Sequence, residues 1–119
     1  MGLDIWFNKV KHTEIGYFRK VNFLVKFFED RGFEREKSTC YVSEDDARDL
    51  LDCCNRVLED HSLAEELLPT TEGFFFGDTE YDEYYFDDVK DVKEFCENTL
   101  IPKFMALDDG EEIQFNIWY

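Results

Sequence analysis

The most regular pattern of apolar and polar positions lies at the two ends of the chain. Residues 112–119 read EIQFNIWY, in which Ile113, Phe115 and Ile117 alternate with Gln114 and Asn116. Residues 3–10 read LDIWFNKV and are rich in β-branched and aromatic residues. Alternation with a period of two is typical of a strand that buries one face. We predict that these two segments are strands and that they pair antiparallel.

A helical period of three to four residues dominates between the two ends. It predicts helices over residues 15–30, 43–60 and 82–100. Ser43 and Asp46 resemble a capping box at the start of the second helix. Pro102 is expected to end the third helix.

Two shorter elements complete the pattern. A turn of helix is expected over residues 63–68, where Pro69 stops it. Phe74 to Phe76, flanked by two glycines, predict a short buried strand. The whole chain, residues 1–119, is therefore expected to form a single α+β domain. Three main helices would pack on one face of a small, mostly antiparallel sheet.

The charge of the chain is large and unevenly distributed. The net charge is -16 at pH 7, and residues 38–119 carry 23 Asp and Glu against 5 Lys and Arg. Direct binding to nucleic acid is disfavoured, because a protein that neutralises phosphates needs a basic surface. A basic protein surface or a small polar ligand is the expected partner, and the oligomeric state stays open.

Several classes of protein lack their signature here. The four cysteines form no C-x-x-C pair, which removes the common zinc and thioredoxin patterns. No basic segment followed by an apolar one opens the chain, and no apolar run approaches 20 residues. We therefore expect no membrane insertion and a cytoplasmic location. No catalytic motif, metal site or cofactor is predicted.

The first group of residues with binding chemistry surrounds the predicted start of the first helix. It consists of His12, Glu14, Tyr17, Arg19, Lys20 and Asn22. A helix N-terminus beside cationic side chains favours a phosphate or a carboxylate. The alternative is an ordinary helix start with solvated charges and a buried ion pair.

The second group lies at the predicted start of the last helix. Tyr81, Asp82, Glu83 and Tyr85 stand in a segment dense in carboxylates and tyrosines. Such a segment could meet a basic partner, with the tyrosines supplying rigid contact area. An acidic, solvated helix start is again the alternative.

Lys20 and Asp88 each fall within the apolar arc of a predicted helix. Because an unpaired buried charge is costly, Lys20 either extends past its neighbours to solvent or meets a carboxylate, and we predict that it forms a buried ion pair with Asp88.

Five segments together resemble a known family. They are GLDIWF, EIGYFRKVN (residues 14–22), YVSEDD, VLEDHSLAEELLPT and GFFFGDTEYDEYYFDDVKD. In this order they resemble a family of small uncharacterised proteins of bacteriophages, prophages and gut bacteria. Members of the family often have Trp at the positions of Phe18 and Phe27. The resemblance implies a small accessory protein in the cytoplasm of a bacterial host.

Two functions are compatible with these observations. The first is a non-enzymatic, acidic binding protein of phage type that interferes with a host protein or a defence pathway. The second is a protein that binds or sequesters a small, nucleotide-like molecule in a polar cleft between the starts of the first and last helices.

Overall fold

A four-stranded antiparallel sheet forms the base of the molecule. The structure is a computed structural model that describes residues 3–9, 13–73, 77–108 and 110–118. The strands are β1 (Asp4–Lys9), β2 (Thr13–Arg19), β3 (Thr39–Val42) and β4 (Ile113–Trp118), and their order is β2-β1-β4-β3. The first and last strands pair antiparallel in the centre of this sheet, which confirms the predicted pairing of the two ends.

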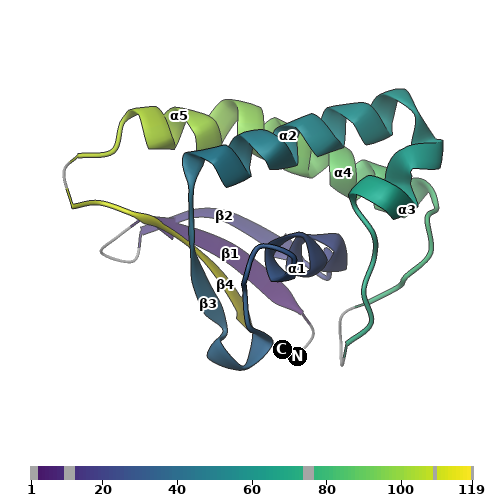
Figure 1. The fold of residues 1–119 in the computed structure, drawn as a ribbon, viewed down its shortest axis with the longest axis horizontal. Coiled ribbons are helices and arrows are strands. Elements are labelled where there is room, and N and C mark those ends of the chain that lie inside the picture. The colour runs from purple at the N-terminus through teal and green to yellow at the C-terminus, as the bar shows by residue number, and fades with distance from the viewer. Residues whose placement is uncertain (1–2, 10–12, 74–76, 109, 119) are drawn as a thin grey trace.

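Helices cover one face of the sheet (Figure 1). The three longer ones are α1 (Asn22–Glu29), α2 (Glu44–Glu59) and α4 (Glu83–Phe95). The shorter elements are the 3-10 turns Arg35–Lys37 and His61–Leu63, α3 (Ala64–Leu67), the π-turn Cys96–Leu100 and α5 (Ile101–Met105). The predicted α+β class, with three main helices on one face, is confirmed.

The core lies between the sheet and the helices. β1 and β4 direct Ile5, Phe7, Phe115 and Ile117 into it, each at most 2% exposed. The Phe115 ring stacks on Phe28 of α1 with 4.3 Å between the ring centroids. The alternation seen in the sequence is thus the alternation between this buried face and the opposite face of the sheet.

The predicted helix over residues 15–30 is wrong in its first half. Residues up to Arg19 belong to β2, which pairs with β1 so that Gly16 and Phe18 lie opposite Phe7 and Ile5. A side chain at Gly16 would overlap the ring of Phe95, so glycine lets α4 approach the sheet here. Pairing with β1 therefore overrides the helical spacing. α1 begins only at residue 22.

The predicted end of the last helix at Pro102 is also wrong. The chain passes from α4 through the π-turn and continues into α5, with the proline in its first turn. A proline in the first turn of a helix removes an N–H that needs no partner there. The helical path therefore continues to Met105.

Other predictions have mixed outcomes. The capping box of α2 is confirmed, since Ser43 Oγ accepts from the Asp46 N–H at 3.0 Å and the Asp46 carboxylate accepts from the Ser43 N–H. The turn of helix before Pro69 is confirmed as α3. β3 was not predicted. The expected strand at residues 74–76 lies outside the described residues.

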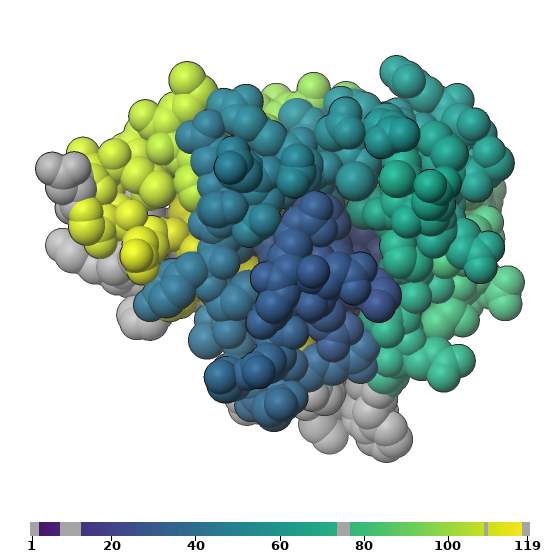
Figure 2. Space-filling view, in the orientation of Figure 1, coloured from purple at the N-terminus to yellow at the C-terminus, as the bar shows by residue number. Residues whose placement is uncertain are grey.

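α1 occupies the centre of one face of the molecule (Figure 2). Its last turn is joined to α2 through Arg31, whose guanidinium lies 3.8 Å from the centroid of the Phe27 ring. The same guanidinium forms ion pairs with Asp46 and Asp49 of α2 at 3.4 and 3.6 Å. These contacts hold the C-terminal end of α1 against α2.

Candidate functional site

A pocket of about 230 Å³ lies where β2 runs into α1, opposite the first turns of α4. Its basic residues are Arg19 and Lys20, which are both exposed. Its acidic residues are Asp78, Glu80, Asp82 and Asp88. The rest of the lining consists of Val21, Asn22, Phe23, Thr70, Gly77, Tyr84 and Tyr85. The pocket therefore carries charges of both signs.

Asn22 holds the wall of the pocket, which consists of residues 68–73 and 77–82. Its side chain is only 3% exposed. Nδ2 donates to the Asp78 carbonyl at 2.9 Å, and Oδ1 accepts from the Thr71 N–H at 3.1 Å. One side chain of α1 thus bonds to this segment at two places, Thr71 and Asp78. Asn22 is accordingly a structural element of the site.

Three further hydrogen bonds hold the same segment in place. Thr70 Oγ1 donates to the Thr79 carbonyl at 2.9 Å, and the Thr70 N–H donates to the Tyr81 hydroxyl at 3.1 Å. The Tyr85 hydroxyl donates to the Leu68 carbonyl at 2.7 Å, and burial raises the pKa of that phenol. Because these bonds are satisfied within the chain, the wall is held in place before any ligand binds.

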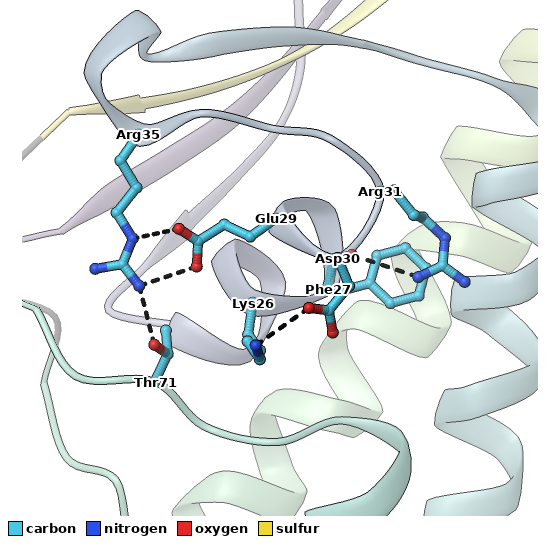
Figure 3. A network of polar contacts seen from close by, with 7 residues as sticks. All are labelled: Lys26, Phe27, Glu29, Asp30, Arg31, Arg35 and Thr71. Atoms are coloured by element: carbon cyan, nitrogen blue, oxygen red, sulfur yellow. Dashed lines mark hydrogen bonds and ion pairs between the residues drawn. The ribbon is translucent and has the colours of Figure 1, made fainter.

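A guanidinium fixes the outer end of the segment (Figure 3). Arg35 donates through Nε and Nη2 to the two carboxylate oxygens of Glu29, at 2.7 and 3.0 Å. Nη2 also donates to Thr71 Oγ1 at 2.9 Å, and Nη1 donates to the Glu72 carbonyl at 3.0 Å. The wall is therefore held to α1 by Asn22 directly and by Glu29 through Arg35.

Two adjoining residues with positive φ shape the basic side of the pocket. Lys20 has a φ of 60° and Gly77 has a φ of 88°. A Cβ on Gly77 would lie 3.1 Å from the Lys20 Cβ, which is a crowded distance. The Lys20 N–H donates to the Leu3 carbonyl at 2.7 Å and so holds the turn against β1. A non-glycine residue in this conformation is uncommon and costs free energy.

The acidic residues of the pocket differ in how they are used. Asp82 caps α4, because Oδ1 accepts from the Tyr85 N–H at 3.1 Å. Asp78 closes a turn, because Oδ1 accepts from the Glu80 N–H at 2.8 Å. Asp88 is partly buried, and within the described part of the chain its carboxylate has no hydrogen bond or ion pair.

The electrostatic environment of Asp88 disfavours its charged form. Burial, followed by the negative charges of Asp91, Asp87 and Asp82, raises the pKa of this carboxyl from 3.8 to about 6. A cation that entered the pocket beside Asp88 would relieve both effects. The carboxylate is thus better suited to binding a cation than the solvated carboxylates along α4 are.

The predicted buried ion pair between Lys20 and Asp88 is not formed. Both residues line the pocket, but Lys20 is exposed, and no ion pair within 4.0 Å joins them among the described residues. The prediction assumed that Lys20 lies on the apolar face of a helix. It lies instead in the turn before α1, where its ammonium reaches solvent.

The pocket brings together five of the ten predicted binding residues. They are Arg19, Lys20, Asn22, Asp82 and Tyr85, drawn from both predicted groups. Their role in binding stays a prediction.

Four of the other predicted residues do not line the pocket, and the fifth, His12, lies outside the described residues. Tyr17 is 51% exposed on β2, and its hydroxyl donates to Asp4 at 2.6 Å. Glu14 is exposed near the start of β2, and Glu83 is exposed as the first residue of α4. The Tyr81 hydroxyl accepts from the Thr70 N–H, and the Tyr81 ring contacts that of Tyr85.

Thr70 and Asp78 of the lining were not predicted as binding residues, whereas Glu80 and Tyr84 stand in the predicted acidic, tyrosine-rich segment without being named as binding residues. Asp78 had a local signal, since an aspartate side chain often accepts a hydrogen bond from the backbone N–H two residues later and so closes a turn. Thr70 had none, because its place depends on contacts with residues nine and eleven positions later.

Comparison with protein-family models, with curated proteins and with solved structures found no match. Among the described residues, no group of three or more histidine, cysteine or acidic side chains is arranged to hold a metal ion. No helix in the described part of the chain has the length and apolar character needed to cross a membrane.

Proposed function

We propose that this protein is a non-enzymatic binding protein and that the pocket between β2, α1 and α4 binds a small polar ligand. The observation that carries the proposal is the state of three charged side chains in its lining. Within the described residues, Arg19, Lys20 and Asp88 have no side-chain hydrogen bond or ion pair. Charges left unpaired around a hollow are available to a ligand.

Basic side chains elsewhere in the protein support this interpretation by contrast. Lys26, Arg31, Arg35, Lys37, Arg48, Arg56 and Lys93 each form an ion pair with a carboxylate. In a chain with 29 acidic residues such pairing is easily achieved. Among the described residues Lys90 and Lys103 also lack an ion pair, but each is a single exposed cation outside the pocket, whereas Arg19 and Lys20 are adjacent and both line it.

The order of the pocket wall is a second support. A ligand site that is organised beforehand loses less conformational entropy on binding. The bonds made by Asn22, Thr70 and Tyr85 hold the wall without using Arg19, Lys20 or Asp88. The structural and the proposed binding residues are therefore different, and they can be altered separately.

A second candidate function is binding of a basic protein partner at the same place. It is favoured by Tyr84, which lines the pocket and is 72% exposed, next to the carboxylates of Glu80 and Asp82. An exposed aromatic ring within an acidic surface is suited to a basic protein surface. The resemblance to a phage family, which stays an expectation, would make that partner a host protein, one of a defence pathway for example.

A thermal-shift screen tests the proposal. The purified protein is mixed with amino acids, nucleotides, phosphorylated metabolites and polyamines. A ligand that binds only the folded state raises the melting temperature by mass action. We expect at least one compound to raise it and Arg19→Ala to abolish the effect, while Arg56→Ala on α2 retains it. A panel without any shift would contradict the small-ligand function.

The same screen directs the search for a protein partner. If no compound acts, Tyr84→Ala and Glu80→Lys become the variants to compare in pull-down experiments with host proteins. Asp82 is unsuited to that purpose, because its side chain caps α4 and its replacement would disturb the helix.

A further inference from the structure

The two kinds of unpaired charge in the pocket come from different elements. Arg19 and Lys20 lie at the junction between β2 and α1, whereas Asp88 lies in the second turn of α4. No ion pair within 4.0 Å joins either cation to Asp88. A ligand that lies between them therefore meets positive charge at one end and negative charge at the other.

The other three carboxylates of the pocket, those of Asp78, Glu80 and Asp82, are exposed, so solvent screens their charge more than that of Asp88. Asp78 and Asp82 each use a carboxylate oxygen to accept a backbone N–H, which holds these side chains to the wall. The Tyr85 hydroxyl donates to a backbone carbonyl. Asp88 is the partly buried carboxylate of the lining that keeps both oxygens available. It is thus the best placed group to receive a ligand cation.

The dimensions of the pocket restrict the ligand further. A volume of about 230 Å³ lies below the several hundred Å³ typical of pockets for drug-sized ligands. A metabolite of a few heavy atoms is compatible with this space, whereas a dinucleotide is too large. Size and charge together indicate a short molecule with a charge at each end.

We propose that the pocket binds a zwitterion of amino-acid size, with its anionic group at Arg19 and Lys20 and its ammonium at Asp88. This inference rests on the proposed function, since it names the ligand class of the same site. It also explains why Lys20 and Asp88 line one pocket without pairing with each other, because each would pair with an oppositely charged group of the ligand. The exposed ring of Tyr84 at the pocket then contacts the part of the ligand that carries no charge.

Isothermal titration calorimetry with matched probes tests the inference. Glycine, β-alanine and γ-aminobutyrate carry both charges at increasing separation. Methylammonium carries only the cation, and acetate carries only the anion. We expect at least one zwitterion to bind tenfold or more tightly than either single ion. One of the three separations should be preferred, because the two ends of the pocket are fixed.

Variants assign the two ends. Asp88→Asn should weaken the preferred zwitterion about tenfold and leave acetate binding unchanged. Arg19→Gln should weaken the zwitterion and leave methylammonium binding unchanged. Arg56→Gln on α2 is the matched control and should bind like the natural sequence.

Three results would overturn the inference, and they differ in what they leave standing. In the first, zwitterions bind no more tightly than methylammonium, and only Asp88→Asn loses this binding. The pocket would then be a cation site, and the proposed function would still hold. In the second, only anions bind, and Arg19→Gln abolishes this binding. The pocket would then be an anion site, and the proposed function would again hold. No binding to any of these probes, together with a blank thermal-shift panel, would remove the inference and the small-ligand function together.

Discussion

Replacing Asp88 by asparagine should stabilise the protein at neutral pH. The carboxyl is partly buried on α4, and it faces the negative charges of Asp91, Asp87 and Asp82 without a described partner of opposite charge. Its folded-state pKa of about 6 lies above the ordinary 3.8. Folding therefore disfavours the charged form, and the asparagine amide, which has nearly the same shape, avoids that cost.

The size and the pH range of the effect follow from the same two values. A difference of about two pKa units corresponds to about 3 kcal/mol in the free energy of unfolding. Since Asp88 is only partly buried, solvent screening reduces this to about 1 kcal/mol. The penalty is absent below about pH 4, grows as the pH rises, and is complete above about pH 6.

Urea unfolding of both proteins at several pH values between 4 and 8 measures this difference. We expect Asp88→Asn to be about 1 kcal/mol more stable at pH 7, which raises the melting temperature by about 4 °C. The two proteins should converge near pH 4. Glu94→Gln, an exposed change of equal charge on the same helix, should show a smaller difference. An Asp88→Asn variant that is less stable at pH 7, or whose advantage does not depend on pH, would refute the reasoning.

Three further substitutions test the packing around the site. Tyr85→Phe should cost about 1 to 2 kcal/mol in urea unfolding, because it leaves a buried backbone carbonyl without its donor, whereas Tyr84→Phe should cost little. Gly16→Ala should destabilise by about 1 to 3 kcal/mol, because its methyl group overlaps the Phe95 ring, and a neutral result would show that the ring moves freely. Arg35→Lys keeps the charge but loses the bidentate geometry, so amide hydrogen exchange at residues 71 and 72 should accelerate about tenfold; unchanged exchange would contradict its anchoring role.

The sequence was sufficient for the parts of the fold whose periodicity is local. The two terminal strands alternate cleanly, and α2 has both a capping box and a continuous apolar face, so each was predicted with nearly the observed bounds. In these elements the local preference of the residues, the apolar pattern and the packing in the fold all favour the same structure. Local patterns identify such elements well.

β2 shows where local reasoning was insufficient. Its spacing of aromatic residues suits a helix, and only pairing with β1 places Gly16 and Phe18 over the core. β3 has four residues, which is too short for a periodic signal. In both cases the decisive contacts join residues far apart in the sequence, and a single sequence does not reveal them.

The candidate site was predicted in part for a related reason. Charged and aromatic residues near Arg19 and Asp82 were recognisable by composition, and the structure brings members of both groups to one pocket. The availability of Asp88 was not recognisable. It depends on Lys20 leaving the helix, on a positive φ at that residue, and on the wall being held by Asn22.

The central claim, that the pocket is the binding site, is tested most directly by NMR titration of the 15N-labelled protein with the strongest ligand from the thermal-shift screen. The account predicts saturable chemical-shift changes concentrated at residues 19–23, 77–82 and 84–88, and their loss in Arg19→Gln and Asp88→Asn. Shifts spread over the outer face of α2, or changes that both variants retain, would contradict it.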